Sequence, residues 1–163
     1  MKYLLLAAGL FLSMSMFVAC GETPDVDLTT LIVGEYSGVV ALNLDTDSLK
    51  DVPDQRIRIS KVDNSTVEIE PVNWPESSPV KDLTLTATLL RTPDGLVNTD
   101  GVSLTIALAS FNDGTVEGTP YLISGGVASD DGKFENNTGE ILFTLQVITD
   151  GVDRYELFEG IKQ

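Results

Sequence analysis

Strict alternation of apolar and polar side chains beyond residue 30 limits what this chain can fold into. In "KDLTLTATLLR", Leu85, Ala87 and Leu89 alternate with threonines. A period of two is typical of half-buried β-strands, because successive side chains point to opposite faces of the sheet. No long run with a helical period follows residue 30. We therefore expect an all-β domain with little helix.

The alternation recurs and predicts about eight strands. They cover residues 31–44, 54–62, 66–72, 80–91, 102–110, 119–129, 138–148 and 153–162. The positions expected to face inward are Ile57, Ile59, Val67, Ile69, Leu83, Leu85, Ala87, Leu89, Val102, Leu104, Ile106, Leu108, Ile141, Phe143, Leu145 and Val147. Threonines and charged residues occupy the positions between them, as expected for a surface in water.

Turn signals separate these strands. Asp-Gly pairs occur at residues 94–95, 100–101, 113–114, 131–132 and 150–151, and Asn64-Ser65 marks a further turn. Asp and Gly accept the positive φ that tight hairpins require. Short links of this kind predict an antiparallel meander.

Closure of the meander would remove strand edges that are prone to aggregation. We predict a single antiparallel eight-stranded up-and-down barrel, whose interior is filled by side chains or holds one small ligand. A two-sheet β-sandwich is the alternative, because the alternation fits both architectures. The inward Leu, Ile, Val and Phe side chains favour a filled interior.

The first 19 residues differ from the rest of the chain. Lys2 precedes the uncharged run "YLLLAAGLFLSMSMFVA", which is the layout of a secretory signal. The stretch from Phe17 to Cys20, "FVAC", resembles the lipobox of bacterial lipoproteins and contains the only cysteine. This resemblance implies cleavage before Cys20, a diacylglycerol on its sulfur and an acyl chain such as palmitate on its amino group. An uncleaved membrane helix is the alternative, although about 17 apolar residues are near the lower limit for spanning.

These features divide the chain into three parts. Residues 1–19 are predicted to be a lipoprotein signal peptide, and residues 20–30 a lipidated flexible tether that is acidic and poor in apolar residues. Residues 31–163 are predicted to form the β-barrel domain. Several acyl chains anchor stably, since each buried CH₂ contributes about 0.8 kcal/mol. We expect a monomer in the cell envelope, held in the outer membrane through Cys20 and facing the periplasm or the surface.

Composition excludes several classes of function. Ten basic and 25 acidic residues leave a net charge of −15, which disfavours nucleic acid as a partner. Histidine is absent, which removes the commonest general base and histidine zinc sites. Carboxylate pairs can hydrolyse glycosides, but no carboxylate is predicted to lie in an apolar setting. We therefore expect a protein that is not an enzyme, without catalytic residues, cofactor or metal site.

Two motifs at the ends of the domain resemble those of a known family. Residues 34–38, "GEYSG", are similar to the Gly-x-Tyr-x-Gly opening of the calycin-like β-barrel lipoproteins of Bacteroides and relatives. Phe158, Gly160 and Lys162 resemble that family's closing strand. The resemblance implies a lipocalin-like barrel without assigned chemistry. It also implies that Tyr36 lies near Lys162, where the two would form a cation–π contact.

Two aromatic residues are candidate contacts for a ligand or partner. Trp74 lies in the proline-rich stretch "PVNWPESSPV", and Pro75 favours an extended backbone there. At a barrel mouth Trp74 would stack on a sugar, peptide or lipid, or alternatively cover the core. Tyr36 has a flat ring with a polar tip, which suits a plug at one end of the barrel or a ligand contact.

We expect a lipid-anchored, non-catalytic envelope protein that binds a small apolar or amphipathic ligand in the barrel, or another protein through its rim. Two alternatives remain open at this point. The protein could be an inhibitor that presents the loop around Trp74 to an extracellular enzyme. It could also be a hydrolase that uses carboxylates alone.

The lipidation prediction is tested by mass spectrometry of the mature protein from its own host. We expect a chain that begins at Cys20 and carries acyl chains, and a Cys20→Ser variant that leaves the membrane fraction. An unmodified Cys20, or a mature chain that still begins at Met1, would contradict the prediction.

Overall fold

The computed structural model describes residues 27–45, 48–91, 101–120, 122–123, 126–127 and 130–163. Strands dominate this part of the chain, and its helices are single turns, α1 (Thr29–Ile32) and the 3₁₀ helix η1 (Pro79–Asp82). The strands are β1 (Gly34–Asp45), β2 (Ser48–Lys61), β3 (Thr66–Asn73), β4 (Leu85–Arg91), β5 (Gly101–Ile106), β6 (Ala109–Phe111), β7 (Gly114–Gly118), β8 (Leu122–Ile123), β9 (Gly126–Val127), β10 (Gly132–Glu135), β11 (Glu140–Thr149) and β12 (Val152–Lys162). The prediction of an all-β chain with little helix is confirmed.

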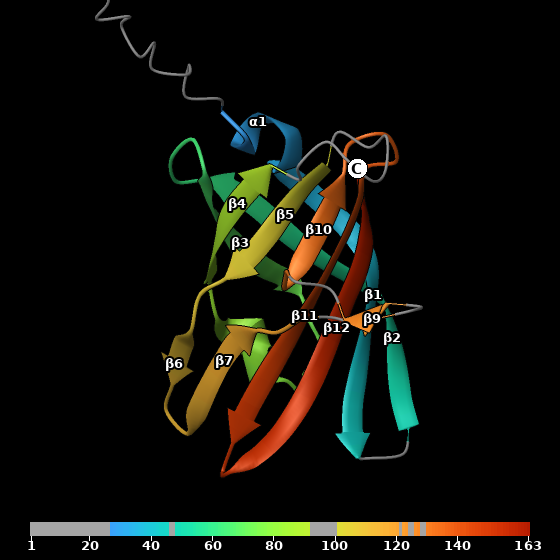
Figure 1. The fold of residues 1–163 in the computed structure, drawn as a ribbon. Coiled ribbons are helices and arrows are strands. Elements are labelled where there is room, and N and C mark those ends of the chain that lie inside the picture. The colour runs from blue at the N-terminus through green and yellow to red at the C-terminus, as the bar shows by residue number, and fades with distance from the viewer. Residues whose placement is uncertain (1–26, 46–47, 92–100, 121, 124–125, 128–129) are drawn as a thin grey trace, which may run out of the picture.

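Ten of these strands form one antiparallel sheet that closes in a ring (Figure 1). Their order is β10-β5-β4-β3-β2-β1-β12-β11-β7-β6, and β10 also pairs with β11. Residues 140–143 of β11 pair with β10, whereas residues 145–149 pair with β7. The ring therefore closes at one end of β11, and β7 and β6 extend the sheet at the other end.

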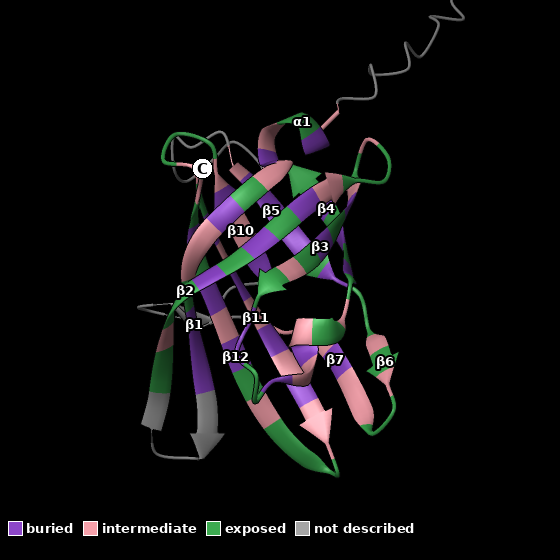
Figure 2. Ribbon diagram, turned by 180° about the vertical axis from the view of Figure 1, so that it is seen from behind, coloured by how far each residue is buried: buried purple, intermediate pink, exposed green. Residues whose placement is uncertain are grey.

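The alternation correctly identified which side chains face inward along most strands. All but two of the predicted inward positions are buried in a single hydrophobic core, and Leu83 is partly buried against it. Its largest buried side chains include Tyr36, Phe134, Phe143 and Phe158. Figure 2 shows buried and exposed residues alternating along β3, β4 and β12. A one-residue slip in pairing would turn each of these faces to water, so burial determines the register.

The prediction is wrong between residues 107 and 131. β5 ends at Ile106 and the chain turns into the hairpin β6–β7, so Leu108 is 60% exposed instead of inward. The strand that closes the ring is β10, whereas the described residues between 119 and 129 form the short pair β8–β9. The carboxylate of Asp131 accepts the backbone N–H of Ile106 at 2.7 Å, beyond the last pair of β5 with β10, while Ile106 still pairs with Ala87 of β4. This contact lies where β5 ends.

Two of the predicted Asp-Gly turns join strands in the structure. Asp150-Gly151 connects β11 to β12, and both residues have positive φ, of 52° and 76°. Asp113-Gly114 lies in the turn between β6 and β7. Asp131-Gly132 leads into β10 instead of closing a hairpin, and Asp94-Gly95 lies outside the described residues.

Helix α1 closes one end of the ring. The Tyr36 hydroxyl donates to the Ile32 carbonyl at 2.5 Å, and the Lys162 ammonium donates to the Leu31 carbonyl at 2.8 Å. The backbone N–H of Leu28 donates to the Asn64 carbonyl at 2.9 Å, and the Leu28 side chain packs against the core. Residues 27 and 28, which were assigned to the tether, therefore contact the folded domain.

The first and last strands lie side by side, and Tyr36 is the register partner of Lys162. The proximity implied by the family resemblance is confirmed. The cation–π contact is made with a different ring, because the Lys162 ammonium lies 5.9 Å from the centroid of Phe134. Tyr36 packs edge-on against that same Phe134 ring, at 6.2 Å between centroids.

Glycine allows β1 and β12 to approach closely. A Cβ on Gly38 would lie 1.9 Å from the carbonyl oxygen of Glu159, and a backbone atom cannot swing away as a side chain can. We predict that Gly38→Ala lowers the free energy of unfolding by about 1–3 kcal/mol, as measured by urea denaturation.

Ser37→Ala is the control for Gly38→Ala. Ser37 is the neighbouring residue on β1 and is only half-buried, so this change is expected to alter stability by less than about 0.5 kcal/mol. Equal effects of the two substitutions would show that the approach of β12 to Gly38 does not limit the fold.

Candidate functional site

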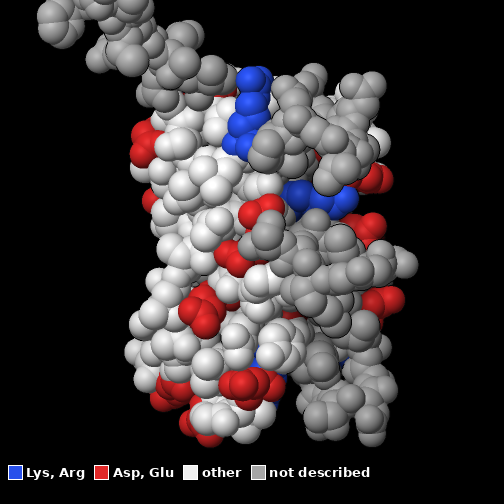
Figure 3. All heavy atoms as spheres, in the orientation of Figure 1, with Lys and Arg blue, Asp and Glu red and all other residues white. Residues whose placement is uncertain are grey.

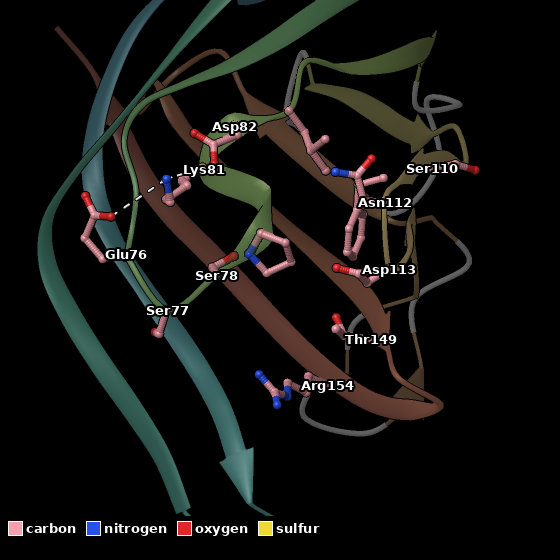
Figure 4. Close-up of a pocket in the computed structure, with 13 residues that line it drawn as sticks. Glu76, Ser77, Ser78, Lys81, Asp82, Ser110, Asn112, Asp113, Thr149 and Arg154 are labelled. Atoms are coloured by element: carbon pink, nitrogen blue, oxygen red, sulfur yellow. Dashed lines mark ion pairs between the residues drawn. The ribbon is translucent and has the colours of Figure 1, made fainter.

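The end of the ring opposite α1 carries an open groove with a volume of about 570 Å³ (Figures 1 and 4). Three parts of the chain form its walls: the loop 76–83, which contains η1, the turn between β6 and β7, and the hairpin ends of β11 and β12. The polar side chains that line it include Glu76, Ser78, Lys81, Asp82, Asn112, Asp113, Thr149 and Arg154.

The groove forms where the sheet stops being a closed ring. Pairing of β2 with β3 begins at Arg56, so the paired residues of β2 before it, 48–52 and 55, pair with β1 alone. Pro75 and Pro79 lie just after β3, and proline cannot donate to a strand ladder. The chain therefore leaves the sheet after Asn73, and the loop 76–83 occupies the space beside the groove.

Trp74 is buried beneath that loop and does not lie open at a barrel mouth. Its side chain is 6% exposed and stacks on Phe158 at 5.7 Å and on Phe143 at 6.4 Å between ring centroids. Its indole N–H donates to Oε2 of Glu156 at 2.9 Å. Trp74 thus covers the core, which was the alternative reading of its position. Tyr36 is also fully buried, at the α1 end and away from the groove.

Glu156 is the residue that the sequence reasoning missed. It is 4% exposed, and its Oε2 accepts hydrogen bonds from both Trp74 and the Ser78 hydroxyl, the latter at 2.8 Å. The expectation that no carboxylate lies in an apolar setting is therefore wrong. The sequence did indicate that Glu156 would be buried, because Glu156 falls on the same alternating face as Phe158 and Gly160.

The Glu156 carboxyl holds the groove wall in place. Ser78 is 3% exposed, and its hydroxyl oxygen also accepts the backbone N–H of Val80 at 3.1 Å, which caps η1. Burial raises the pKa of Glu156, while the hydrogen bonds from Ser78 and Trp74 and the positive charge of Arg154 oppose this rise. One buried carboxyl thus ties the loop 76–83 to β12.

The inward face of the β11–β12 hairpin changes from apolar to polar toward the groove. Phe143 opposes Phe158 across the hairpin, Leu145 opposes Glu156, and Val147 opposes Arg154. Thr149 follows at the end of β11. Along this face, the aromatic side chains of the core are therefore followed by charged and hydroxyl-bearing side chains at the groove.

Several polar groups of the groove lack a partner within the described part of the protein. The Thr149 Oγ1 atom is buried and has no hydrogen-bond partner there, and Arg154 forms no ion pair with a described residue. Lys81 differs, because it pairs with Asp82 at 2.8 Å and Glu76 at 3.8 Å. In Figure 4, Ser78 lies across the opening from Asp113 and Thr149, and Arg154 lies at its lower edge.

Charge is otherwise spread over the surface. Figure 3 shows acidic side chains scattered over the visible face instead of gathered in one patch. Within the described ranges, no group of three or more His, Cys, Asp or Glu residues is placed to hold a metal ion. Neither single-turn helix of this part of the chain has the length or apolar character of a membrane span.

Comparison of the chain with protein-family models, with curated proteins and with solved structures gives no match. The likeness to the calycin-like lipoproteins consequently rests on the motifs at residues 34–38 and 158–162. Cys20 and the predicted signal peptide lie outside the described residues, so lipidation stays a prediction.

The buried Glu156 carboxyl predicts a specific dependence of stability on pH. Because its pKa is raised in the folded state, the folded protein retains a proton that the unfolded chain releases near the ordinary Glu pKa of about 4.3. This contribution to stability is complete below that value and is lost as pH rises through the folded-state pKa. We predict that Glu156→Gln becomes more stable relative to the parent as pH rises from about 4 to about 7.

Urea denaturation at a series of pH values, followed by Trp74 fluorescence, measures this difference. Glu159→Gln is the matched control, since Glu159 is exposed on the opposite face of β12. A difference between Glu156→Gln and the parent that stays constant with pH would contradict the burial argument.

Proposed function

We propose that this protein is a lipid-anchored, non-catalytic binding protein of the bacterial envelope that takes a small amphipathic ligand in the groove. The groove itself is the observation that supports this proposal. Its volume of about 570 Å³ falls within the range of roughly 300–1,000 Å³ typical of small-molecule sites. Its lining combines hydrogen-bonding side chains with the apolar surfaces of Pro79, Leu83 and Phe111.

The expected position of the ligand moves from the interior to the end of the ring. Large aromatic side chains, Tyr36, Phe134, Phe143 and Phe158, are packed inside the ring between α1 and the groove. The packing of these rings favours a ligand that binds at the open end, where the inward residues become polar. Tyr36 and Trp74 then support the site from within the core.

We further propose that the ring is the eight-stranded up-and-down barrel of the calycin-like lipoproteins. Support comes from the hydrogen-bonded path β10-β5-β4-β3-β2-β1-β12-β11, which returns to β10. In this view β6 and β7 are an extension attached to β11. The adjacency of Tyr36 and Lys162 also favours the barrel over the sandwich, because it joins the first strand to the last.

The proposed anchor would turn the groove away from the membrane. The described chain begins at Asp27 beside α1, and the groove lies at the opposite end of the ring (Figure 1). The residues from Cys20 to Asp27 span at most about 25 Å when fully extended, since each residue contributes at most about 3.6 Å. Attachment at Cys20 would therefore bring α1 near the lipid and expose the groove to solution.

The buried position of Trp74 weakens the inhibitor alternative. An inhibitory loop would need an exposed aromatic anchor, whereas this indole is stacked on two core rings. The hydrolase alternative would require a carboxyl group of raised pKa that faces the ligand, whereas the Glu156 carboxyl, whose pKa is raised, accepts hydrogen bonds from Trp74 and Ser78 behind the groove wall. Hydrolysis of a bound glycan by the protein would favour the hydrolase alternative.

Blocking the groove tests the proposed binding site. We predict that Asn112→Trp, at an exposed position of the groove rim, abolishes binding while the fold persists, because the indole fills space that the ligand needs. Native mass spectrometry of protein from its own host would detect the co-purified ligand. Rebinding of the released molecule to the parent and to the variant is measured by titration calorimetry, because Asn112→Trp adds a second tryptophan to Trp74, the single one in the chain.

Asn136→Trp serves as the control for this variant. Asn136 is likewise exposed in a turn, between β10 and β11, and does not line the groove. If both variants retain the ligand, or if the parent protein carries none, the groove is not the binding site.

A further inference from the structure

We propose that the groove binds a neutral polyhydroxylated ligand of the saccharide class, whose hydroxyl groups pair with Thr149, Arg154 and Asp113. This inference rests on the proposed function and specifies the chemistry of the ligand. Three independent features of the groove point to it: the balance of charge, the kinds of polar group left without partners, and the apolar surface beside them.

The charge balance argues against a charged ligand. The groove is lined by three acids and two bases, Glu76, Asp82, Asp113, Lys81 and Arg154. A chain with a net charge of −15 repels an anion. A cation would have to sit beside the guanidinium of Arg154, which has no ion-pair partner among the described residues and cannot be deprotonated. A neutral ligand avoids both penalties.

The available polar groups call for hydroxyls in particular. Arg154 can only donate hydrogen bonds, the Asp113 carboxylate oxygens accept them, and the Thr149 hydroxyl can do both. Ligand hydroxyl groups complement all three, because each one both donates and accepts. The buried Thr149 Oγ1, which has no partner in the described part of the protein, strengthens the argument, since an unmade buried hydrogen bond is unfavourable.

Apolar surface next to these groups fits the carbon face of a sugar ring. Phe111 lines the groove and is only partly buried against the core, and Pro79 and Leu83 line it on the facing loop. Aromatic and aliphatic side chains pack against apolar C–H surfaces, while hydroxyls at the ring edge reach the polar groups. Because the groove is open, both a free saccharide and the end of a longer glycan share the required chemistry.

The Thr149 hydroxyl provides a sharp test. Titration calorimetry and Trp74 fluorescence would measure binding of neutral disaccharides (maltose, lactose and cellobiose) to the parent and to Thr149→Val. We expect the valine variant to bind about three- to tenfold more weakly, the effect of one lost hydrogen bond. Its urea midpoint should be equal or higher, because the change removes a buried hydroxyl that has no protein partner.

Thr144→Val is the matched control on the same strand. The Thr144 Oγ1 is also buried without a partner among the described residues, but Thr144 does not line the groove. Thr144→Val should raise or preserve stability, as Thr149→Val does, and leave the affinity for disaccharides unchanged. Equal affinities of the two valine variants would overturn the proposed role of Thr149.

The nature of the ligand is tested with charged analogues and salt. We expect the best neutral disaccharide to bind more tightly than a uronic-acid disaccharide or a glucosamine dimer, with an affinity that does not change with ionic strength. Arg154→Gln should weaken binding of the neutral disaccharide without creating a preference for either charged probe. A neutral tetrasaccharide that binds more tightly than its disaccharide indicates a glycan end, and equal affinity indicates a free saccharide; both agree with the inference.

Tighter and salt-dependent binding of a charged probe would overturn the saccharide inference. The saccharide inference would also be overturned if no disaccharide binds while Asn112→Trp still loses a co-purified ligand. That result would still support the proposed function. Absence of any ligand from both experiments would overturn the proposed function as well.

Discussion

The close pairing of β1 with β12 is the constraint on which the rest of the structure depends. It joins the two ends of the domain, and without it both strands would expose an unpaired edge and the core between them would open. Gly38 makes the approach possible, because any side chain there would meet the backbone of Glu159. The same pairing brings Lys162 to the α1 end, where its ammonium binds the Leu31 carbonyl and closes the ring over Tyr36.

The opposite end depends on a different interaction, the buried Glu156 carboxyl. By accepting hydrogen bonds from Trp74 and Ser78, it joins a proline-rich loop to the last strand across 78 to 82 residues of sequence. Burying a carboxyl is unfavourable unless it is hydrogen-bonded, so this arrangement is conspicuous in a chain whose other acids are mostly exposed. Its structural consequence is a fixed wall for the groove. The Glu156 carboxyl, whose pKa is raised, thus lies behind the proposed ligand site and supports its wall.

Local pattern predicted the strands where one face is buried along their whole length. The positions from Ile141 to Val147 and from Leu85 to Leu89 are buried as expected, because alternation with a period of two is a property of neighbouring residues. The prediction was wrong where a distant residue contacts the end of a strand. The Asp131 carboxylate accepts the backbone N–H of Ile106, 25 residues away in sequence, at the point where β5 ends. No local feature around Leu108 predicts the turn into β6. The short β10 was missed for the same reason, since its pairing with β5 and β11 defines it more than its own four residues do.

The candidate site was largely hidden from sequence reasoning. Trp74 was noticed for its chemistry, but only the folded chain places its ring against Phe143 and Phe158. The sequence by itself determined the all-β character and most of the inward faces, because strand periodicity is local, whereas the meeting of Tyr36 with Lys162 was implied only by the resemblance of the end motifs. Tertiary structure alone decided that Glu156 is buried and that Asp113, Thr149 and Arg154 surround one groove. The physical reason is that these contacts depend on where the β2–β3 ladder stops and on which strand extends β11, and both are settled by packing between distant segments.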